Sequence, residues 1–311
     1  MLKPPISFNY SASGAARLGP SHAGTCDVSA IRFDGRVVLI TGAARGLGHA
    51  YAEVIAARGG TVALHDAGVD MEGAAADPSI AQDAANRIAR EGGRAHAFAQ
   101  DLSTRDACEE LVAEVRRRLG RIDALIHSAG LVAYTGLVET PPERIEQLLA
   151  VNVAAPLWLC RAVLPLMREQ QYGRIVLTVS GHGAFRTGAT DLTVYATTKA
   201  AQAGLTYALA DEGAAYGVKV NAISPAARTR MYRREVAAGE MTPQQVAPAV
   251  AYLASESCAV SGVIVRAANG HFSLGRYAIT DGIDVAGAEL TPDTIARRWG
   301  EIEGGTLRLP S

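Results

Sequence analysis

The sequence predicts a single α/β domain in which a doubly wound, seven-stranded parallel sheet is covered by helices on both faces. Seven short apolar and β-branched runs alternate with longer stretches rich in alanine and leucine. The short runs lack the polar alternation of a half-exposed strand, and the repeat of strand, helix and strand specifies right-handed crossovers. Of the 311 residues, 49% are hydrophobic and 20% charged. This composition supports one large core and excludes a disordered or fibrous chain.

Helix-start signals along the chain separate the elements of this predicted domain. Thr140-Pro141-Pro142-Glu143 has the order of a helix start, with a capping hydroxyl, an early proline and a carboxylate, and Thr242-Pro243 and Thr291-Pro292 repeat the theme. In an open parallel sheet, ligands bind beyond the carboxyl ends of the strands, at the switch point. The expected strands cover residues 36–40, 61–65, 95–99, 124–127, 174–179, 219–223 and 262–266.

Charge and cysteine content limit the classes of function. The 30 Lys+Arg and 31 Asp+Glu leave a net charge of −1, which argues against nucleic-acid or membrane-surface partners. The four cysteines match neither a metal cluster nor a disulfide scaffold, and histidines such as His49, His65 and His96 lack metal spacing, so no metal is predicted. His182, two positions after Ser180, is expected to shape the substrate mouth, with a titrating role in the site as the alternative. The first thirty residues lack a signal-peptide core, and no run reaches the about twenty apolar residues of a membrane span, which predicts a cytoplasmic protein.

The same pass along the chain predicts its organisation. Residues 1–30 form an N-terminal extension that is either disordered or lies on the surface, and residues 31–275 form the main domain. Residues 276–311 form a tail that packs on this domain or on a partner subunit.

A glycine-rich turn follows the first expected strand. It reads Thr41-Gly42-Ala43-Ala44-Arg45-Gly46-Leu47-Gly48, and a helix can propagate after it. The glycines allow the backbone to approach a pyrophosphate, which the N–H groups and dipole of the helix N-terminus attract. The alternative is a glycine-rich turn without a ligand. The strand before it and the helix after it favour dinucleotide binding.

The end of the second expected strand bears on the choice of dinucleotide. Asp66 lies 18 positions beyond Gly48, where a carboxylate can accept hydrogen bonds from an adenosine ribose and repel a 2′-phosphate. Arg45 could pair with such a phosphate instead. The sequence therefore favours NAD and leaves NADP open. Asp66 could also do no more than cap the following turn.

Tyr195 and Lys199 are the strongest candidates for chemistry. At i, i+4 in an expected helix, they project from one face. An ammonium beside the phenol should lower its pKa from about 10, and an oxidised nicotinamide would add to the shift, so that the phenol can exchange a proton near neutral pH. Ser180 follows the fifth expected strand, where its hydroxyl can stabilise charge on a substrate oxygen. The alternative is an incidental surface pair beside an ordinary surface serine.

Together these residues resemble the short-chain dehydrogenase/reductase family over about residues 31–275. The resemblance implies a Rossmann-type fold and hydride transfer between a nicotinamide and a secondary alcohol or ketone. Tyr195 would be the general acid/base, Ser180 would polarise the substrate oxygen, Lys199 would bind the nicotinamide ribose, and Asn152 would anchor a water that relays protons. Further residues implied to contact the cofactor, besides those of the glycine turn and Asp66, are Asp101, Leu102, Ser128, Ala129, Gly130, Pro225 and Thr229.

Three positions depart from the family pattern. His127-Ser128 replaces two asparagines, which is expected to loosen the bracing of the fourth strand. The interval from Ser180 to Tyr195 is 15 positions, two more than expected, which could reshape the substrate mouth. Ala226 stands where the family usually has glycine.

A closer resemblance concerns the substrate. Residues 221–231 and 256–258 are similar to the hydroxyacyl-CoA dehydrogenase domains of multifunctional β-oxidation enzymes and to bacterial hydroxysteroid dehydrogenases, which implies a bulky substrate. Arg228, Arg230, Arg233 and Arg234 could meet the phosphates of coenzyme A or form a solvated helical face. Two other functions keep the dinucleotide: a redox-neutral dehydratase or epimerase, and a non-catalytic sensor.

The expected helices at 143–167 and 195–215 are apolar around much of their circumference, with Leu157, Trp158 and Leu159 consecutive in the first. So wide a stripe predicts a homodimer or homotetramer, as the family resemblance also implies, with a large monomer core as the alternative.

Overall fold

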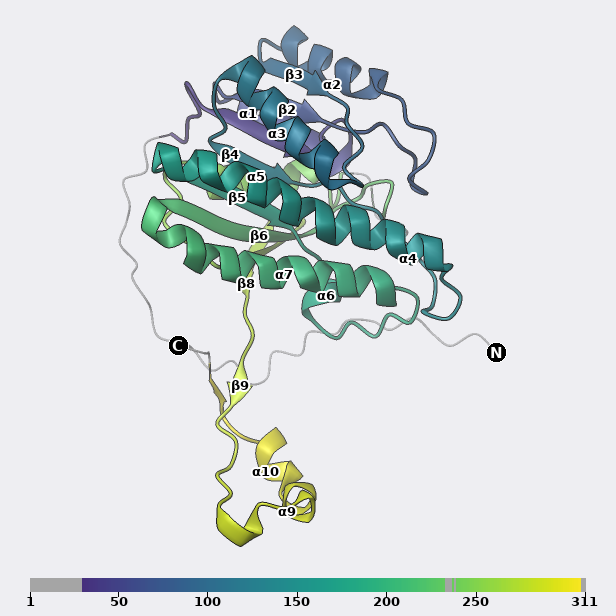
Figure 1. Ribbon diagram of the computed structural model, residues 1–311, viewed down its shortest axis with the longest axis vertical. Coiled ribbons are helices and arrows are strands. Elements are labelled where there is room, and N and C mark those ends of the chain that lie inside the picture. The colour runs from purple at the N-terminus through teal and green to yellow at the C-terminus, as the bar shows by residue number, and fades with distance from the viewer. Residues whose placement is uncertain (1–29, 233–236, 238, 309–311) are drawn as a thin grey trace. The chain divides into compact units, whose positions relative to one another are not determined.

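The computed structural model describes residues 30–232, 237 and 239–308, and within them all seven expected strands lie in one sheet, mutually parallel (Figure 1). The strand order is β3-β2-β1-β4-β5-β6-β7-β8, so the direction of winding switches between β1 and β4. The strands are β1 Val37–Thr41, β2 Thr61–His65, β3 Arg94–Phe98, β4 Ala124–His127, β5 Gly173–Thr178, β6 Val218–Ala226, β7 Ile264–Ala268 and β8 His271–Gly275.

The eighth strand corrects the expected number. β8 pairs with β7 in the antiparallel direction, with Ala268 opposite His271. Between them, Asn269 and Gly270 have φ values of 49° and 76°. Two residues with positive φ form the turn that matches the twist of a hairpin, and Asn-Gly is a favoured sequence for it. The sheet is therefore mixed at this edge and parallel elsewhere.

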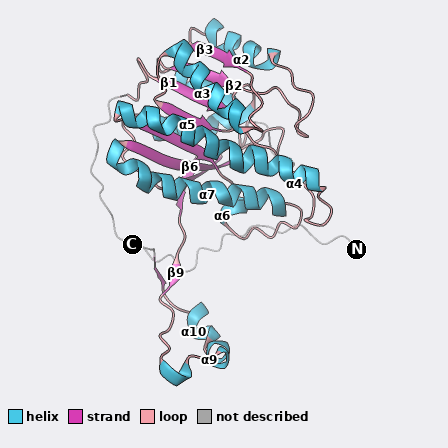
Figure 2. Cartoon of the chain, viewed as in Figure 1, coloured by secondary structure: helices cyan, strands magenta, loops and turns pink. Residues whose placement is uncertain are grey.

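Helices cover both faces of the sheet (Figure 2). The helices α1, α2 and α8 pack on one face and α3, α5 and α7 on the other. On the second face α3 and α5 are neighbours, joined by an ion pair of 2.7 Å between Arg161 and Glu109. The helix bounds are α1 Gly46–Ala56, α2 Ser79–Arg90, α3 Arg105–Leu119, α4 Pro142–Leu149, α5 Ala155–Gln170, α6 Gly181–Ala184, α7 Thr193–Gly213 and α8 Ala247–Ala254.

Two of the three predicted helix caps are present. Thr242 forms a capping box with Gln245 at the 3₁₀ turn Pro243–Gln245, and the Thr291 side chain accepts a hydrogen bond from the Thr294 amide. The prediction for Thr140 is wrong. Its hydroxyl donates instead to the Gly136 carbonyl, at 2.7 Å, so α4 begins one residue later without a side-chain cap.

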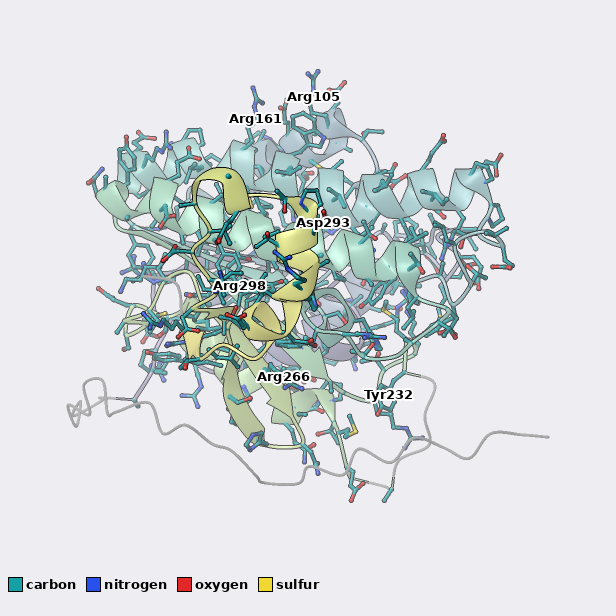
Figure 3. The ribbon with its side chains drawn as sticks, turned by 90° about the horizontal axis from the view of Figure 1, so that it is seen from below. Arg105, Arg161, Tyr232, Arg266, Asp293 and Arg298 are labelled. Atoms are coloured by element: carbon teal, nitrogen blue, oxygen red, sulfur yellow. The ribbon has the colours of Figure 1, made fainter. Side chains whose placement is uncertain are left out.

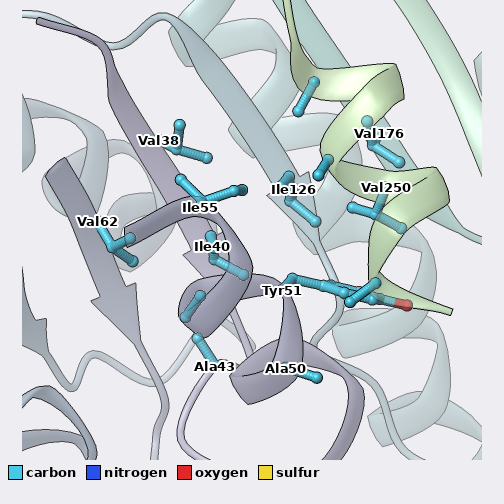
Figure 4. Close-up of a cluster of buried hydrophobic side chains, with 14 of the residues drawn as sticks. Val38, Ile40, Ala43, Ala50, Tyr51, Ile55, Val62, Ile126, Val176 and Val250 are labelled. Carbon is cyan, nitrogen blue, oxygen red and sulfur yellow. The ribbon is translucent and has the colours of Figure 1, made fainter. Parts of the chain in front are cut away.

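The core on the α1 face shows how the strands fix the site above them. Val38 and Ile40 of β1 are fully buried beside Ile55 of α1, while Ile126 of β4 and Val250 of α8 pack across the switch point (Figure 4). Burying an aliphatic side chain contributes about 1.5–3 kcal/mol. The carboxyl ends of β1 and β4, which carry the candidate site, therefore rest on a close-packed layer.

One long helix on the opposite face contains an irregular turn. The expected helix at 143–167 consists of α4, a π-helical turn at Ala150–Ala154 and α5. The whole Pro142–Gln170 segment is long and apolar enough to span a membrane, against the expectation that no segment qualifies, which counted only uninterrupted apolar residues. Leu159, Val163 and Met167 are fully or almost fully buried among the core side chains of this face, as in a core helix.

The last described segment, beyond Gly275, has its own small framework. Strands β9 Ile279–Thr280 and β10 Leu307–Arg308 pair in the antiparallel direction and flank α9 Pro292–Arg297 and α10 Trp299–Glu303. Arg298, between the two helices, pairs with Glu301 at 2.8 Å (Figure 3). The expected extension at residues 1–30 lies almost wholly outside the described residues.

Candidate active site

The predicted glycine turn connects β1 to α1 at the switch point. Gly42 has a φ of 65°, and a Cβ there would lie 2.7 Å from the Ala129 nitrogen. A Cβ at Gly48 would lie 2.1 Å from the Gly42 carbonyl oxygen. Neither position has space for a side chain. In the described chain no side chain caps the start of α1, whose first N–H groups remain available to a pyrophosphate.

Asp66 lies beside this turn. Its carboxylate accepts hydrogen bonds from the Ala44 amide at 3.1 Å and the Gly68 amide at 2.9 Å. The Arg45 guanidinium is 3.7 Å from the same carboxylate and donates to the Val69 carbonyl at 2.8 Å. The two side chains predicted to influence ribose binding, Asp66 and Arg45, therefore lie together, and Asp66 also caps the turn, the role given as its alternative.

The segment after β4 is joined to β1 through Thr41. The Ser128 amide donates to the Thr41 carbonyl at 3.2 Å, and the Ala129 amide to its hydroxyl at 3.3 Å. That hydroxyl is also 2.9 Å from Nδ1 of His127, which is fully buried. His127 therefore braces the fourth strand, and the expected loosening is wrong because the imidazole finds its own partner on β1.

Some of the other residues predicted to contact the cofactor lie near the glycine turn or at the end of β6, and the rest have partners of their own or lie in the core. Thr229 lies over the glycine turn, with its methyl 3.3 Å from a Cβ built on Gly46, and Pro225 lies in β6 opposite Ala267. Asp101 accepts hydrogen bonds from the amide and hydroxyl of Ser103, which gives its carboxylate a local partner. The remaining one, Leu102, is buried in the core beside α3.

Ser180 and Tyr195 meet at the carboxyl edge of the sheet. Ser180 begins α6, where its side chain accepts a hydrogen bond from the His182 amide at 3.2 Å. Its hydroxyl also acts to lower the pKa of the phenol of Tyr195, in the first turn of α7, which indicates that the two side chains lie near each other. His182 pairs through Nδ1 with Thr187, at 2.8 Å, in the longer loop that follows. Ser180 and Tyr195 are therefore neighbours without a ligand.

Lys199 and Asn152 complete the group. The Lys199 ammonium donates to the Thr178 carbonyl, at the end of β5, at 2.7 Å and lies 5.9 Å from the centre of the Tyr195 ring. Asn152 lies in the π turn and exchanges two hydrogen bonds of 2.8 Å with the backbone of Leu131. A Cβ on Gly130 would lie 3.2 Å from the Asn152 side-chain oxygen and 3.5 Å from the Lys199 nitrogen. Gly130 therefore lies close to both the Asn152 side-chain oxygen and the Lys199 nitrogen.

The electrostatics of the tyrosine differ from the expectation. Burial raises the pKa of Tyr195 to about 12, although the Ser180 hydroxyl acts in the opposite direction. Burial also lowers the pKa of Lys199 to about 8. The expected lowering by Lys199 is wrong for this state of the site, because the amine is itself desolvated and its ammonium is directed to the Thr178 carbonyl. The phenol is a proton donor at neutral pH.

Sequence reasoning missed three contributors. Tyr134, after β4, acts electrostatically on Tyr195 and donates to the Met231 carbonyl. Thr198 and Gln202, both on α7, contact Asn152. The helical spacing from Lys199 to Gln202 was the available signal, since residues three apart share a face.

Of the four arginines expected near the substrate cleft, Arg228 is exposed and Arg230 donates to the Val69 carbonyl at 2.9 Å. Arg233 and Arg234 lie outside the described residues. Across the described part of the chain, no group of three or more His, Cys, Asp or Glu side chains is arranged to hold a metal ion.

A doubly wound sheet with a glycine cradle at its switch point, and a half-buried tyrosine beside a buried serine and a buried lysine, defines a dinucleotide-dependent oxidoreductase. Comparisons with known proteins agree. The family model for short chain dehydrogenases matches residues 36–239, and the chain belongs to this family. It is an NAD(P)-dependent oxidoreductase acting on CH–OH groups.

Individual relatives extend the similarity. The chain is 33% identical over 273 residues to a putative short-chain type dehydrogenase/reductase of Mycobacterium tuberculosis, covering 86% of this chain and 93% of that protein. It is 32% identical over 277 residues, 88% of its length, to the peroxisomal hydratase-dehydrogenase-epimerase of Saccharomyces cerevisiae, of which it spans 30%. A crystal structure of a short chain dehydrogenase from Mycobacterium avium superposes with a TM-score of 0.77 at 31% identity, covering 90% of this chain and 98% of that one.

Proposed function

We propose that this protein interconverts a secondary alcohol and a ketone on a bulky acyl substrate, a hydroxyacyl thioester, with NAD as cofactor. The observation that carries the proposal is the placement of Tyr195 beside Ser180 and the buried Lys199 at the carboxyl edge of the sheet: Ser180 acts on the pKa of the phenol, and the Lys199 nitrogen lies 5.9 Å from the centre of the Tyr195 ring. A hydroxyl pair of this kind can hold and protonate one substrate oxygen.

The residues of the glycine turn fit a dinucleotide. The space that a Cβ would fill at Gly42 and Gly48 is already taken by backbone atoms, so the turn presents bare backbone and the uncapped N-terminus of α1. Asp66 or Arg45 would hold the ribose, Thr229 and residues 128–130 would line the site, and Lys199 would bind the nicotinamide ribose. The bound nicotinamide supplies the hydride acceptor or donor.

The chain's own residues handle the proton. With a pKa of about 12, the Tyr195 hydroxyl is protonated at neutral pH and can donate to a carbonyl oxygen that Ser180 also polarises. In the opposite direction the phenol must lose its proton, and Lys199, with a pKa of about 8, is close enough to neutrality to exchange protons itself. Asn152 would fix the water that connects Lys199 to solvent.

Asp66 favours NAD over NADP because its carboxylate is held by two backbone amides and would repel a 2′-phosphate. Arg45 supports the opposite choice, but its guanidinium is shared between Asp66 and the Val69 carbonyl.

The thioester substrate rests on the resemblance of residues 221–231 to hydroxyacyl-CoA dehydrogenase domains and on the exposed guanidinium of Arg228. We expect Arg228→Ala to raise KM for a 3-hydroxyacyl-CoA and to leave KM for the matching N-acetylcysteamine thioester unchanged, because the second compound lacks the nucleotide phosphates. Equal effects on both thioesters would remove coenzyme A recognition from the proposal.

We also propose a homodimer or homotetramer. A groove of about 220 Å³ between α5 and α7 is lined mostly by apolar residues, including Leu157, which is 46% exposed, and Gln202 also lines it. Trp299 and Leu307 of the last segment are 57% and 70% exposed, which favours packing of residues 276–308 on a partner subunit. Size-exclusion chromatography with light scattering would contradict this with a sole species near 32.5 kDa.

The direct test of the activity is a screen of the purified protein with NAD and NADP. Its substrates are 3-hydroxyacyl-CoAs, hydroxysteroids and small secondary alcohols. Reduced nicotinamide should form in equal amount to the ketone product. Product formation without nicotinamide reduction would instead indicate a redox-neutral enzyme. A cytoplasmic location and the absence of membrane and nucleic-acid partners stay part of the proposal; the yeast relative is named as peroxisomal.

A further inference from the structure

Both polar atoms of the Asn152 side chain already have hydrogen-bond partners. Its oxygen accepts from the Leu131 amide, and its nitrogen donates to the Leu131 carbonyl and, at 3.0 Å, to the Thr198 hydroxyl. The residue therefore joins the loop after β4 to α7. Besides the remaining lone pair of its side-chain oxygen, Asn152 can offer a proton path its main-chain carbonyl, which lies in the π turn.

Gln202 already binds that carbonyl. Its amide nitrogen donates to the Asn152 main-chain oxygen at 2.7 Å, across the space between α7 and the π turn. A carbonyl oxygen has two lone pairs, so this bond leaves one for a second donor. Gln202 is only 1% exposed, which means that this amide has been removed from bulk water to make the contact.

The other end of the same amide is unpaired. The side-chain oxygen of Gln202 is buried and finds no hydrogen-bond partner among the described residues. Leaving a buried amide oxygen unpaired is unfavourable, and such groups are normally satisfied by an ordered water. Because Gln202 follows Lys199 by three positions in α7, the two side chains lie on one face of the helix.

We propose that Gln202 is a positioning residue for proton exchange at Lys199: its amide nitrogen holds the Asn152 carbonyl, and its amide oxygen fixes a buried water against that carbonyl. A water that donates one hydrogen to each oxygen has both hydrogens oriented, and its lone pair is left to accept from the Lys199 ammonium. The inference rests on the proposed function and adds to it the group that orients the relay water.

Few titrating groups face Lys199 besides the proposed water. Tyr195 precedes it by one turn of α7, and His127 faces it from β4. Burial and the neighbouring Lys199 lower the pKa of His127 to about 3, so the imidazole stays neutral over the working range. A change in the titration of Lys199 can therefore be assigned to Gln202 without a contribution from that histidine.

The lysine itself can be observed directly. The chain contains Lys3, Lys199 and Lys219 as its lysines, so ¹³Cε-lysine labelling gives few signals, and Lys199→Arg assigns the relevant one. In Gln202→Leu we expect the pKa of Lys199 to fall by about one unit, because the ammonium loses its hydrogen-bonded water. In Gln202→Glu the nearby carboxylate should raise it. This measurement needs no substrate.

A matched control is available in Gln170, at the end of α5. Its amide nitrogen also donates to a main-chain carbonyl, that of Ile122 at 2.9 Å, but on a strand connection away from the site. Gln170→Leu should leave the Lys199 titration unchanged. Light scattering on all variants shows whether subunit assembly is altered, and Thr206→Val, which removes a hydrogen bond to the Gln202 carbonyl, controls for disturbance of α7.

With a substrate identified, kcat for Gln202→Leu should fall about tenfold and its pH profile should shift with the Lys199 pKa, while KM stays within about twofold. The positioning role is overturned if Gln202→Leu and Gln202→Glu both leave the Lys199 titration at the wild-type value. A wild-type protein with no turnover on any alcohol or ketone would defeat the proposed function alone, since the titration arm is read without substrate.

Discussion

Gly48 offers a test of the dinucleotide cradle that can be worked out from distances. In Gly48→Ala the new Cβ would lie 2.1 Å from the Gly42 carbonyl oxygen and 2.8 Å from its carbon, both backbone atoms in a turn. No side-chain rotation relieves such a contact. The turn and the first residues of α1 must move apart by about 1 Å to restore an ordinary contact.

That displacement sets the expected loss of affinity. Amide–phosphate hydrogen bonds tolerate a range of about 0.5 Å, so a movement of about 1 Å removes those made by the shifted amides. Two charge-assisted bonds at about 1.5 kcal/mol each amount to about 3 kcal/mol, or about a 100-fold rise in Kd. The fold should survive, because the hydrophobic layer beneath the turn is not touched.

The assay is calorimetric titration of NAD, with circular dichroism on the same samples to verify folding. Gly300→Ala is the control, because a Cβ there, in α10, meets nothing within 4 Å. Its Kd should equal that of the wild-type protein. A Gly48→Ala variant that is folded and binds NAD within threefold of wild type would refute the placement of the pyrophosphate on this turn.

Three further outcomes are expected. Tyr195→Phe should lower kcat by at least about 1000-fold while NAD binding persists, because only the proton donor is removed; a variant retaining a tenth of the rate would assign the proton to another group. Asp66→Ala should narrow the preference for NAD over NADP by about tenfold, as Arg45 is then free to pair with a 2′-phosphate; competition binding with both dinucleotides measures it, and an unchanged ratio contradicts the assignment. His127 is buried with a pKa of about 3, so in the folded state it binds no proton between pH 6.5 and 3, whereas in the unfolded chain it does. The free energy of unfolding should therefore decrease as the pH is lowered through this range, by up to about 1.4 kcal/mol per pH unit. Urea denaturation of His127→Asn should show a shallower fall, and equal slopes would mean that the imidazole is hydrated.

The centre of the sheet was predictable because strands such as β1 and β4 are buried on both faces and read as apolar runs, whereas β3, with Arg94 and His96 exposed, departs from this pattern. The strand that was missed, β8, is exposed at Phe272 and Leu274, and polar residues or glycine alternate with these two side chains. Its signal was the Asn269-Gly270 turn rather than its hydropathy. The π turn at Ala150–Ala154 had no signal, because one extra residue in a helix barely changes the periodicity of a long apolar face.

At the candidate site, the sequence predicted which residues come together but not the pKa values that they have there. The spacing of Tyr195 and Lys199 predicted a shared helix face, which the structure shows. It could not show that Lys199 would be buried and Tyr195 half-buried, nor that desolvation would raise the pKa of the phenol by more than Ser180 lowers it. Thr140 likewise has the expected residue type without the expected contact, since its hydroxyl donates to the Gly136 carbonyl and does not cap the helix N-terminus.

The central claim is that Tyr195 and Ser180 stand beside the reacting carbon of a bound nicotinamide. A crystal structure of the protein with NAD and an unreactive ketone or alcohol would measure this directly. Both hydroxyls should lie about 2.6–3.2 Å from the oxygen of that compound, next to nicotinamide C4. A nicotinamide ring bound elsewhere, or a Tyr195 hydroxyl turned away with no space for a substrate between them, would contradict the account.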